Sequence, residues 1–218
     1  MRISAPSGAP RPSAPVSGDA GAPRLLLATH NEHKRREFAR LLCSASGEPQ
    51  WQLASLPADL TLPHEDGETF AANALDKARA AAAGTRRVSI ADDSGIEAAA
   101  LDGAPGIRSA RYAGEHASDA ENLAKLLRQA PPASPLRYVC ALAYVDPEHG
   151  IERVFEGRCD GRLAARPRGE RGFGYDPAFL PDDGPPELTM AELSDEQKDA
   201  ISHRGRAVRA LLEWLRRG

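Results

Sequence analysis

The chain has 218 residues, of which 41% are hydrophobic, and a formal net charge of -3. This length suffices for one domain, or for two closely joined lobes, with a substantial core. The acidic balance argues against a dedicated nucleic-acid-binding protein, although a few focused cations can still hold a small anionic substrate.

Residues 1–23 are rich in alanine, proline, serine and glycine, and we expect a disordered tail before a folded part that starts near Arg24. No apolar region follows the early arginine as in a secretory signal, and no later run approaches the roughly 18 apolar residues that span a bilayer. Cys43, Cys140 and Cys159 lack metal-ligand spacing and are expected to be reduced thiols. These features favour a cytoplasmic protein without membrane contact.

Between residues 24 and 91 short apolar runs alternate with helical stripes. One of the stripes is alanine-rich and ends at Gly84, a residue type that commonly stops helices. The predicted elements, in chain order, are a strand at 24–29, a helix at 32–43, a strand around 51–56, a helix at 68–84 and a strand at 87–91.

In the second half, two capping-box patterns mark helix starts at Ser118 and Ser194. An apolar run with hydrophobic residues on both faces predicts a central buried strand, which a short turn joins to its partner in a long hairpin. We expect a helix at 118–129, strands at 136–146 and 151–163, a glycine-rich loop, and a helical C-terminus whose Val208, Leu211, Leu212 and Leu215 share one face. The order of elements indicates a mixed α/β fold.

The segment "ADDSGIEAAALDGAPGIRSARYAG" places Asp92 and Asp93 directly after the last predicted strand of the first half. Acids at the strand ends of α/β proteins lie where ligands usually bind. Carboxylates beside a hydroxyl suit Mg²⁺, and a second carboxylate can act as a general base on water. The alternative is an Asx turn closed by Gly95. Arg108 and Arg111 are candidate partners for these acids or for phosphate.

The loop "ATHNEHK" leaves a strand and enters a helix, where free backbone N–H groups and the helix dipole favour an anion. Thr29, Asn31 and Lys34 supply polar groups for phosphate oxygens, although a helix cap and a solvated lysine are the commoner arrangement. Asn73 and Lys77 lie four residues apart on one face of the next predicted helix. They line a polar cleft or face solvent.

The stretch "RGERGFGYDPAF" combines glycines, which allow close backbone approach, with Phe173 and Tyr175, which offer faces for stacking a base. A structural turn is the alternative. Lys198, His203 and Arg204 form either a functional basic group at a helix end or a surface cluster. Together these stretches provide a base-stacking loop, phosphate-binding cations, an acidic magnesium-type cluster and a candidate base. These groups suit cleavage of a nucleotide phosphoanhydride.

Five motifs, in this order and spacing, resemble those of the inosine/xanthosine triphosphate pyrophosphatases. They are "THNEHKRREF", "HEDGETFAANALDKA", "ADDSGIEAAALDGAPGIRSARYAG", "GERGFGYDPAF" and "TMAELSDEQKDAISHRGRA". The resemblance covers residues 24–218 and implies one catalytic domain of two lobes, an elongated mixed sheet flanked by helices around a central substrate cleft. It also implies a homodimer and Mg²⁺-dependent hydrolysis of ITP, dITP or XTP to the monophosphate and pyrophosphate.

Carried over onto matching positions, the resemblance implies that Asp93 is the general base and a metal ligand, and that Glu65 is the second acidic metal ligand. Asn73 and Lys77 match polar positions that face the cleft, and Asp92 is left as a supporting contact. The residues that match substrate contacts are Thr29, His30, Asn31, Glu32, His33 and Lys34 in the first loop, Ser94 beside the base, Phe173, Gly174, Tyr175 and Asp176 in the base pocket, and Lys198, His203 and Arg204 near the C-terminus.

Departures from the family pattern are small. His30 and His33 stand where the family is usually smaller, and Arg171 lies where members vary. A donor from His203 or Arg204 would favour a 6-oxo purine over adenine, because an unpaired buried donor costs about 1–3 kcal/mol. Two alternatives stay open: a related pyrophosphatase acting on other modified nucleotides, and a non-catalytic nucleotide-binding module.

Overall fold

The computed structural model describes residues 24–43 and 51–217, so the tail expected at 1–23 lies outside the described residues. One mixed sheet has the strand order β2-β1-β3-β4-β5-β6. The strands are β1 (Arg24–Leu27), β2 (Gln52–Ser55), β3 (Ser89–Ala98), β4 (Pro135–Asp146), β5 (Ile151–Leu163) and β6 (Phe179–Pro181). The helices are α1 (Glu32–Leu41), α2 (Phe70–Thr85), α3 (Asp119–Gln129), α4 (Asp195–Ile201) and α5 (His203–Arg216), with 3₁₀ helices at Ala99–Leu101, Gly106–Arg111 and Asp176–Ala178.

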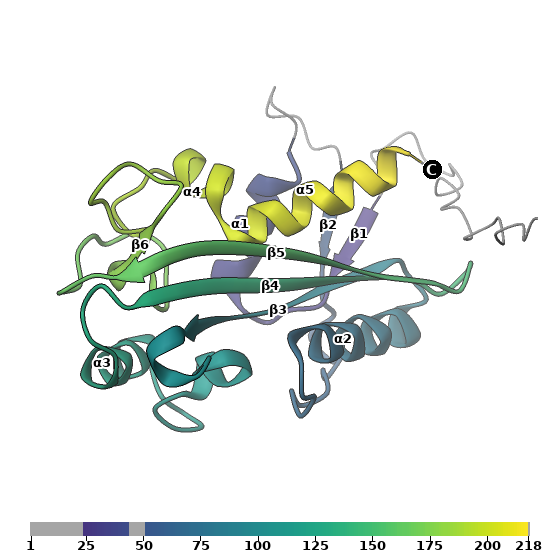
Figure 1. Ribbon diagram of the computed structural model, residues 1–218. Coiled ribbons are helices and arrows are strands. Elements are labelled where there is room, and N and C mark those ends of the chain that lie inside the picture. Colours follow the sequence, from purple (N-terminus) through teal and green to yellow (C-terminus); the bar gives the residue numbers. More distant parts are fainter. Residues whose placement is uncertain (1–23, 44–50, 218) are drawn as a thin grey trace, which may run out of the picture.

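The mixed α/β fold predicted from the pattern is confirmed. β1 pairs in parallel with β2 and β3, whereas β3, β4, β5 and β6 pair antiparallel in that order. β4 is buried along most of its length, as its apolar pattern predicts, and forms the expected hairpin with β5. The long strands β3, β4 and β5 run across the molecule, with α2 against one face and α5 against the other (Figure 1).

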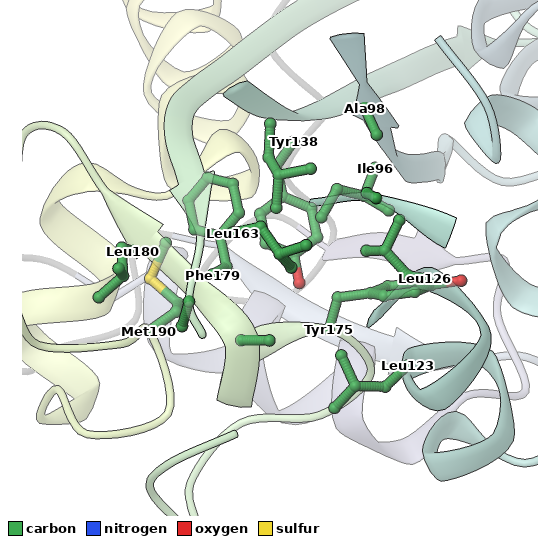
Figure 2. Close-up of a cluster of buried hydrophobic side chains, with 14 of the residues drawn as sticks. Ile96, Ala98, Leu123, Leu126, Tyr138, Leu163, Tyr175, Phe179, Leu180 and Met190 are labelled. Carbon is green, nitrogen blue, oxygen red and sulfur yellow. The ribbon is translucent and has the colours of Figure 1, made fainter. Parts of the chain in front are cut away.

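Three clusters of buried side chains hold the helices on the sheet. The alanines of α2 pack on the small side chains of β3 and β4, so this helix can lie close to the sheet. On the opposite face, α1 and α5 share a second cluster with β1, β3 and β4. A third cluster joins α3 to the far end of the sheet, where Leu126, Tyr138, Tyr175 and Phe179 meet (Figure 2). The single sheet therefore supports α1, α2, α3 and α5, which pack on it through these clusters.

The expected boundary between strand and acidic turn was wrong. β3 continues through Asp92 and Asp93 to Ala98, because all 10 of its residues pair with β4. Gly95 is thus a strand residue and closes no Asx turn. A Cβ atom at Gly95 would lie 2.4 Å from the carbonyl oxygen of Gly106, so the glycine lets the 3₁₀ helix that starts there pack directly on the strand.

Two helix ends also differ from expectation. α2 runs past Gly84 to Thr85, and Arg86 takes the left-handed conformation (φ 53°) that closes it. The helical C-terminus is two helices, because Ser202 ends α4 and its side chain caps α5 by accepting a hydrogen bond from Gly205 N. This break makes His203 and Arg204 the first residues of α5.

The start of α5 lies directly on β5. A Cβ atom at Gly157 would stand 2.0 Å from the carbonyl oxygen of His203, so only glycine permits this approach. Within the described part of the chain, no helix combines the length and apolar character needed to cross a membrane.

Candidate active site

The cleft follows an unpaired stretch of β3. The ladder between β1 and β3 stops at the pair Leu27 and Ile90, after which the chain leaves β1 for the loop before α1. Among the described residues, no backbone ladder covers this edge of β3 between Ala91 and Ser94. The acidic residues of β3 therefore lie beside the first loop and the start of α1, where Lys34 contacts Asp92.

Asp92 lies on the face of β3 that α1 and α5 cover. Its Oδ2 is 3.1 Å from Lys34 Nζ and 3.1 Å from Arg204 Nη2, and it also accepts a hydrogen bond from Ser94 Oγ at 3.1 Å. Burial opposes ionisation of Asp92, but these cations outweigh that effect and hold its pKa below the usual range. The sequence-based view of Asp92 as a minor supporting contact understated its position at the centre of the site.

Asp93 points to the opposite face, toward α2, because successive strand residues alternate. Its carboxylate accepts hydrogen bonds from Asn73 Nδ2 at 2.8 Å and from Ser94 N at 2.9 Å. Burial raises the pKa of Asp93, the charge of Lys77 opposes the rise, and the nearby charge of Glu65 adds to it. A carboxylate with a raised pKa is the better proton acceptor, which suits the general base that the resemblance implies.

Glu65 is held beside Asp93 by two cations. Lys77 Nζ contacts the Glu65 carboxylate and donates to the backbone oxygen of Asp92 at 2.8 Å. Arg111 Nη2 donates to the backbone oxygen of Glu65 at 2.9 Å. Asn73 and Lys77 thus contact Asp93 and Glu65, and Arg111 contacts Glu65. Arg108 instead lines a separate groove beside the start of α2.

The described acidic side chains are too few at any one place to hold magnesium without further ligands. Within residues 24–43 and 51–217, no three acidic, histidine or cysteine side chains gather into a cluster that would hold a metal on its own. Mg²⁺ is commonly held by one or two carboxylates together with substrate phosphates. Glu65 and Asp93 provide such oxygens on the face of β3 that α2 covers. This donor set fits magnesium that arrives with a phosphorylated substrate.

The first loop forms the N-terminus of α1. Asn31 caps the helix by accepting from Lys34 N at 3.1 Å, and Thr29 Oγ1 accepts from Asn31 N at 3.2 Å. Lys34 turns inward to Asp92, whereas Glu32 turns outward to Arg35. Asn31 is therefore both the ordinary helix cap and part of the cavity wall. His30 is exposed and is not among the residues that line the cavity.

A cavity of about 100 Å³ opens between the first loop, α3, the glycine-rich loop and α5. Such a volume is below the roughly 300–1,000 Å³ of pockets that enclose a whole small molecule, so it suits one part of a nucleotide. Its lining residues are Asn31, Ser94, Gly95, Ser109, Ala110, Asp119, Tyr138, Phe173, Gly174, Tyr175, Asp176, Lys198, His203 and Arg204. Nine of these were expected as substrate contacts.

The Asp176 carboxylate anchors the glycine-rich loop through a hydrogen bond from its backbone. Its carboxylate accepts from Phe173 N at 3.0 Å, from Tyr138 Oη at 3.0 Å and from Lys198 Nζ at 2.6 Å. The Phe173 ring consequently lies within 5.2 Å of Lys198 Nζ, and it stacks with the His33 ring at 5.2 Å between centroids. Gly174 N donates to Asp119 at 2.8 Å and anchors the loop to α3.

His203 lines the cavity and carries a buried nitrogen without a partner. Its ring stacks on Tyr138 at 4.5 Å between centroids, and Nδ1 is buried without a hydrogen-bond partner in the described structure. Burial, aided by the charge of Arg204, lowers the pKa of His203 well below its usual range, so the imidazole is neutral. Arg204, by contrast, donates to Glu37, Asp92 and Ser94. Of the two donors considered from the sequence, His203 has the free polar atom.

Sequence reasoning missed Glu37, a buried acid that contacts both Lys198 and Arg204. The signal was available, since Glu37 stands three residues after Lys34 and so shares its helix face. Tyr138, Ser109 and Asp119 were also missed. They belong to a central strand, a 3₁₀ turn and a helix cap region, where their types have ordinary structural explanations.

The sequence model of the Ham1 family matches residues 25–214 of the chain. The chain belongs to the Ham1 family. A dITP/XTP pyrophosphatase of Cutibacterium acnes is 47% identical over 193 residues, which cover 87% of this chain and 94% of that protein. The resemblance inferred from the five motifs is thereby confirmed.

Solved structures agree with the Ham1 assignment. The Ham1 protein of Staphylococcus aureus has a TM-score of 0.73 at 38% identity, over 88% of this chain and 98% of that one. A nucleoside-triphosphatase / dITP/XTP pyrophosphatase of Mycobacterium abscessus has a TM-score of 0.65 at 44% identity, over 87% and 98%. The family fold expected from the sequence is therefore the fold of this chain.

Proposed function

We propose that this Ham1-family chain hydrolyses non-standard purine nucleoside triphosphates, such as dITP, ITP and XTP, to the monophosphate and pyrophosphate. The observation that supports this proposal most directly is that Arg204 lines a base-sized cavity and also contacts Asp92 of the acidic centre. The names of relatives at 44% to 47% identity, all dITP/XTP pyrophosphatases, support the same substrate class.

The chemistry follows from the placement of Lys34, Asp93 and the first loop. The free N–H groups at the start of α1 and the Lys34 ammonium bind the triphosphate, whose negative charge they neutralise. Asp93 accepts a proton from the attacking water as the new phosphorus–oxygen bond forms. The α–β phosphoanhydride bond breaks, the pyrophosphate takes the bonding electrons, and the nucleoside monophosphate keeps the oxygen of water.

Magnesium is part of this proposal. Glu65 and Asp93 are the residues that would hold it, and when bound it neutralises phosphate charge as the phosphoanhydride breaks. We expect EDTA to reduce turnover to background and added Mg²⁺ to restore it, while the far-ultraviolet circular dichroism spectrum stays unchanged. Turnover that persists in excess EDTA would contradict the assignment.

Base selection is assigned to His203. A neutral imidazole whose Nδ1 carries the proton donates to the 6-oxo group of hypoxanthine or xanthine. Adenine places an amino donor at that position, which leaves both donors unpaired and costs about 1–3 kcal/mol. The stack on Tyr138 fixes the ring in the orientation that this contact needs.

A homodimer and a cytoplasmic location are further proposals. The family resemblance supports the dimer, and free cysteines, of which Cys140 and Cys159 are buried, support a reducing compartment. Sedimentation velocity of the full chain at micromolar concentration tests the dimer. A single species with the mass of one chain would contradict it.

Product identification tests the function itself. The chain is incubated with ITP, ATP and GTP in the presence of Mg²⁺, and the released phosphate species are separated. We expect pyrophosphate and inosine monophosphate from ITP. Release of orthophosphate would indicate another class of hydrolase, and binding without release would indicate a non-catalytic nucleotide-binding module.

A further inference from the structure

Glu37 is a buried acid that the proposed chemistry does not use. It lies on α1, one helical turn after Lys34, and only 6% of its surface is exposed. Its Oε1 is 2.6 Å from Lys198 Nζ, and its Oε2 accepts from Arg204 Nη1. One carboxylate therefore joins α1 to a lysine of α4 and an arginine of α5.

Each of these two cations also donates to an acid at one end of the site. Lys198 donates to Asp176, which carries the glycine-rich loop of the base cavity. Arg204 donates to Asp92 of the acidic centre. The order of contacts is Lys34, Asp92, Arg204, Glu37, Lys198 and Asp176. Positive and negative groups alternate along it, and Glu37 lies between the two ends.

Glu37 has no place among the groups that would touch the nucleotide. It is absent from the lining of the cavity, whereas Lys198 and Arg204 are part of it. A carboxylate would also repel the triphosphate. Any influence of Glu37 on the reaction must therefore pass through the two cations that it contacts.

The consequence of losing Glu37 follows from electrostatics. Without its charge, the Lys198 ammonium and the Arg204 guanidinium become buried like charges with one shared partner fewer. Each then moves toward its remaining acid, Asp176 or Asp92, or toward the substrate phosphates. Either movement changes the cavity wall and the acidic centre together.

We propose that Glu37 is a positioning residue that holds Lys198 and Arg204 in fixed orientations and so couples base recognition to alignment of the acidic centre. This inference rests on the proposed function and names a residue that shapes its selectivity. Glu37 acts only through its contacts with Lys198 and Arg204 and makes no contact with the nucleotide.

Glu37→Gln is the test variant, because it keeps the size of the side chain and removes its charge. Removal of an outer partner that orients the side chains in direct contact with a site typically costs about 10- to 100-fold in activity. We expect a loss of that size in kcat/KM for ITP, a higher KM as well as a lower kcat, and a reduced ratio of kcat/KM for ITP to that for ATP. Inosine monophosphate, measured by calorimetry, binds more weakly.

Arg40→Gln is the matched control. Arg40 lies on the same helix and also reaches α4, where its Nε is 3.0 Å from Asp199 Oδ2, but it is outside the cleft. It reports the effect of loosening α1 against α4 without disturbing Lys198 or Arg204. We expect Arg40→Gln to keep the ratio of ITP to ATP and the affinity for inosine monophosphate, whatever its melting temperature.

The proposal is overturned if folded Glu37→Gln keeps the wild-type kinetics, or if both variants change the selectivity ratio equally. If Glu37→Gln does not fold, Glu37→Asp, which keeps the charge but is too short to span both cations, is judged by the same criteria. Failure of the proposed function is distinguishable, because the wild-type chain would then release no pyrophosphate from ITP.

Discussion

Asp92 and Asp93 are neighbours in β3 whose pKa values shift in opposite directions. Both are buried, which by itself raises the pKa of a carboxyl group. Lys34 and Arg204 reverse the effect at Asp92 and lower its pKa, whereas at Asp93 the effect of burial prevails and the pKa is raised. Strand alternation places the two side chains in these different surroundings. Two carboxylates separated in this way commonly take different roles in one reaction.

Asp93→Asn removes the proton acceptor while keeping the size of the side chain. A positioned general base contributes about 10²- to 10⁴-fold, so we expect a drop of at least that size in kcat. Affinity for inosine monophosphate, measured by calorimetry, stays within a few-fold of wild type. Undiminished turnover in a folded Asp93→Asn variant would refute the role of Asp93.

The pH dependence follows from the same residue. Asp93 must be ionised to accept a proton, and burial raises its pKa in the metal-free chain, so with Mg²⁺ limiting we expect activity to fall at a higher pH than an ordinary aspartate would give. Glu37, by contrast, has its pKa lowered from 4.5 to about 2, so its stabilising contacts persist until the pH approaches that lower value. Measured at constant Mg²⁺, kcat/KM should decline on acidification before the circular dichroism signal does. Coincident loss of both would contradict this order.

His203→Phe tests the unpaired nitrogen. Phenylalanine preserves the stack on Tyr138 and removes Nδ1, so the cavity keeps its shape and loses one donor. The ratio of kcat/KM for ITP to that for ATP should fall by about 10-fold or more, in line with the 1–3 kcal/mol of an unpaired donor. An unchanged ratio would assign selectivity to another group.

Part of the site could be predicted from residue types in their local pattern. Phe173, Asp93 and Lys198 stand in stretches whose glycines, paired acids or basic group suggest chemistry. The spacing of Glu37 from Lys34 places both on one helix face, but the partners of Glu37 and of Tyr138 could not be predicted from the sequence. Glu37 contacts Arg204, 167 positions away, and Tyr138 contacts Asp176, 38 positions away, so only the fold brings these partners together.

At the scale of elements, the close contact between α5 and β5 positions His203 and Arg204. Gly157→Ala should force the start of α5 away from the sheet, because its Cβ would stand 2.0 Å from the carbonyl oxygen of His203. Overpacking of this kind costs about 1–3 kcal/mol, so the free energy of unfolding, measured with urea, falls by that amount and kcat/KM falls with it. Glu156→Ala, at the neighbouring exposed position, is the control. Wild-type activity in Gly157→Ala would argue against a rigid placement of α5.

The sequence predicted elements well where periodicity and caps were strong. The hairpin of β4 and β5 and the capping box of α3 have such signals and are confirmed. The end of β3 was misplaced because acidic and glycine residues normally indicate a turn, and here pairing with β4 outweighs that preference. The break at Ser202 was missed because a capping serine inside an apolar helical pattern resembles an exposed helix residue.

At the scale of the whole molecule, one sheet carries both ends of the site. β3 presents the acidic centre, and the hairpin of β4 and β5 extends toward α3 and β6 (Figure 1). At that end α3 and the glycine-rich loop help to line the base cavity. Glu37 of α1 contacts Lys198 of α4 and Arg204 of α5, and these contacts link the three helices between the two ends of the site. Base recognition and phosphoanhydride cleavage are thus properties of a single connected structure.

The most direct test of this account is the steady-state kcat/KM of the wild-type chain for ITP, XTP and ATP under one Mg²⁺ concentration, with pyrophosphate quantified as the product. The account predicts that ITP and XTP exceed ATP by about 10-fold or more, as expected for loss of one buried hydrogen bond. Equal values for the three nucleotides, or turnover of ATP alone, would contradict it.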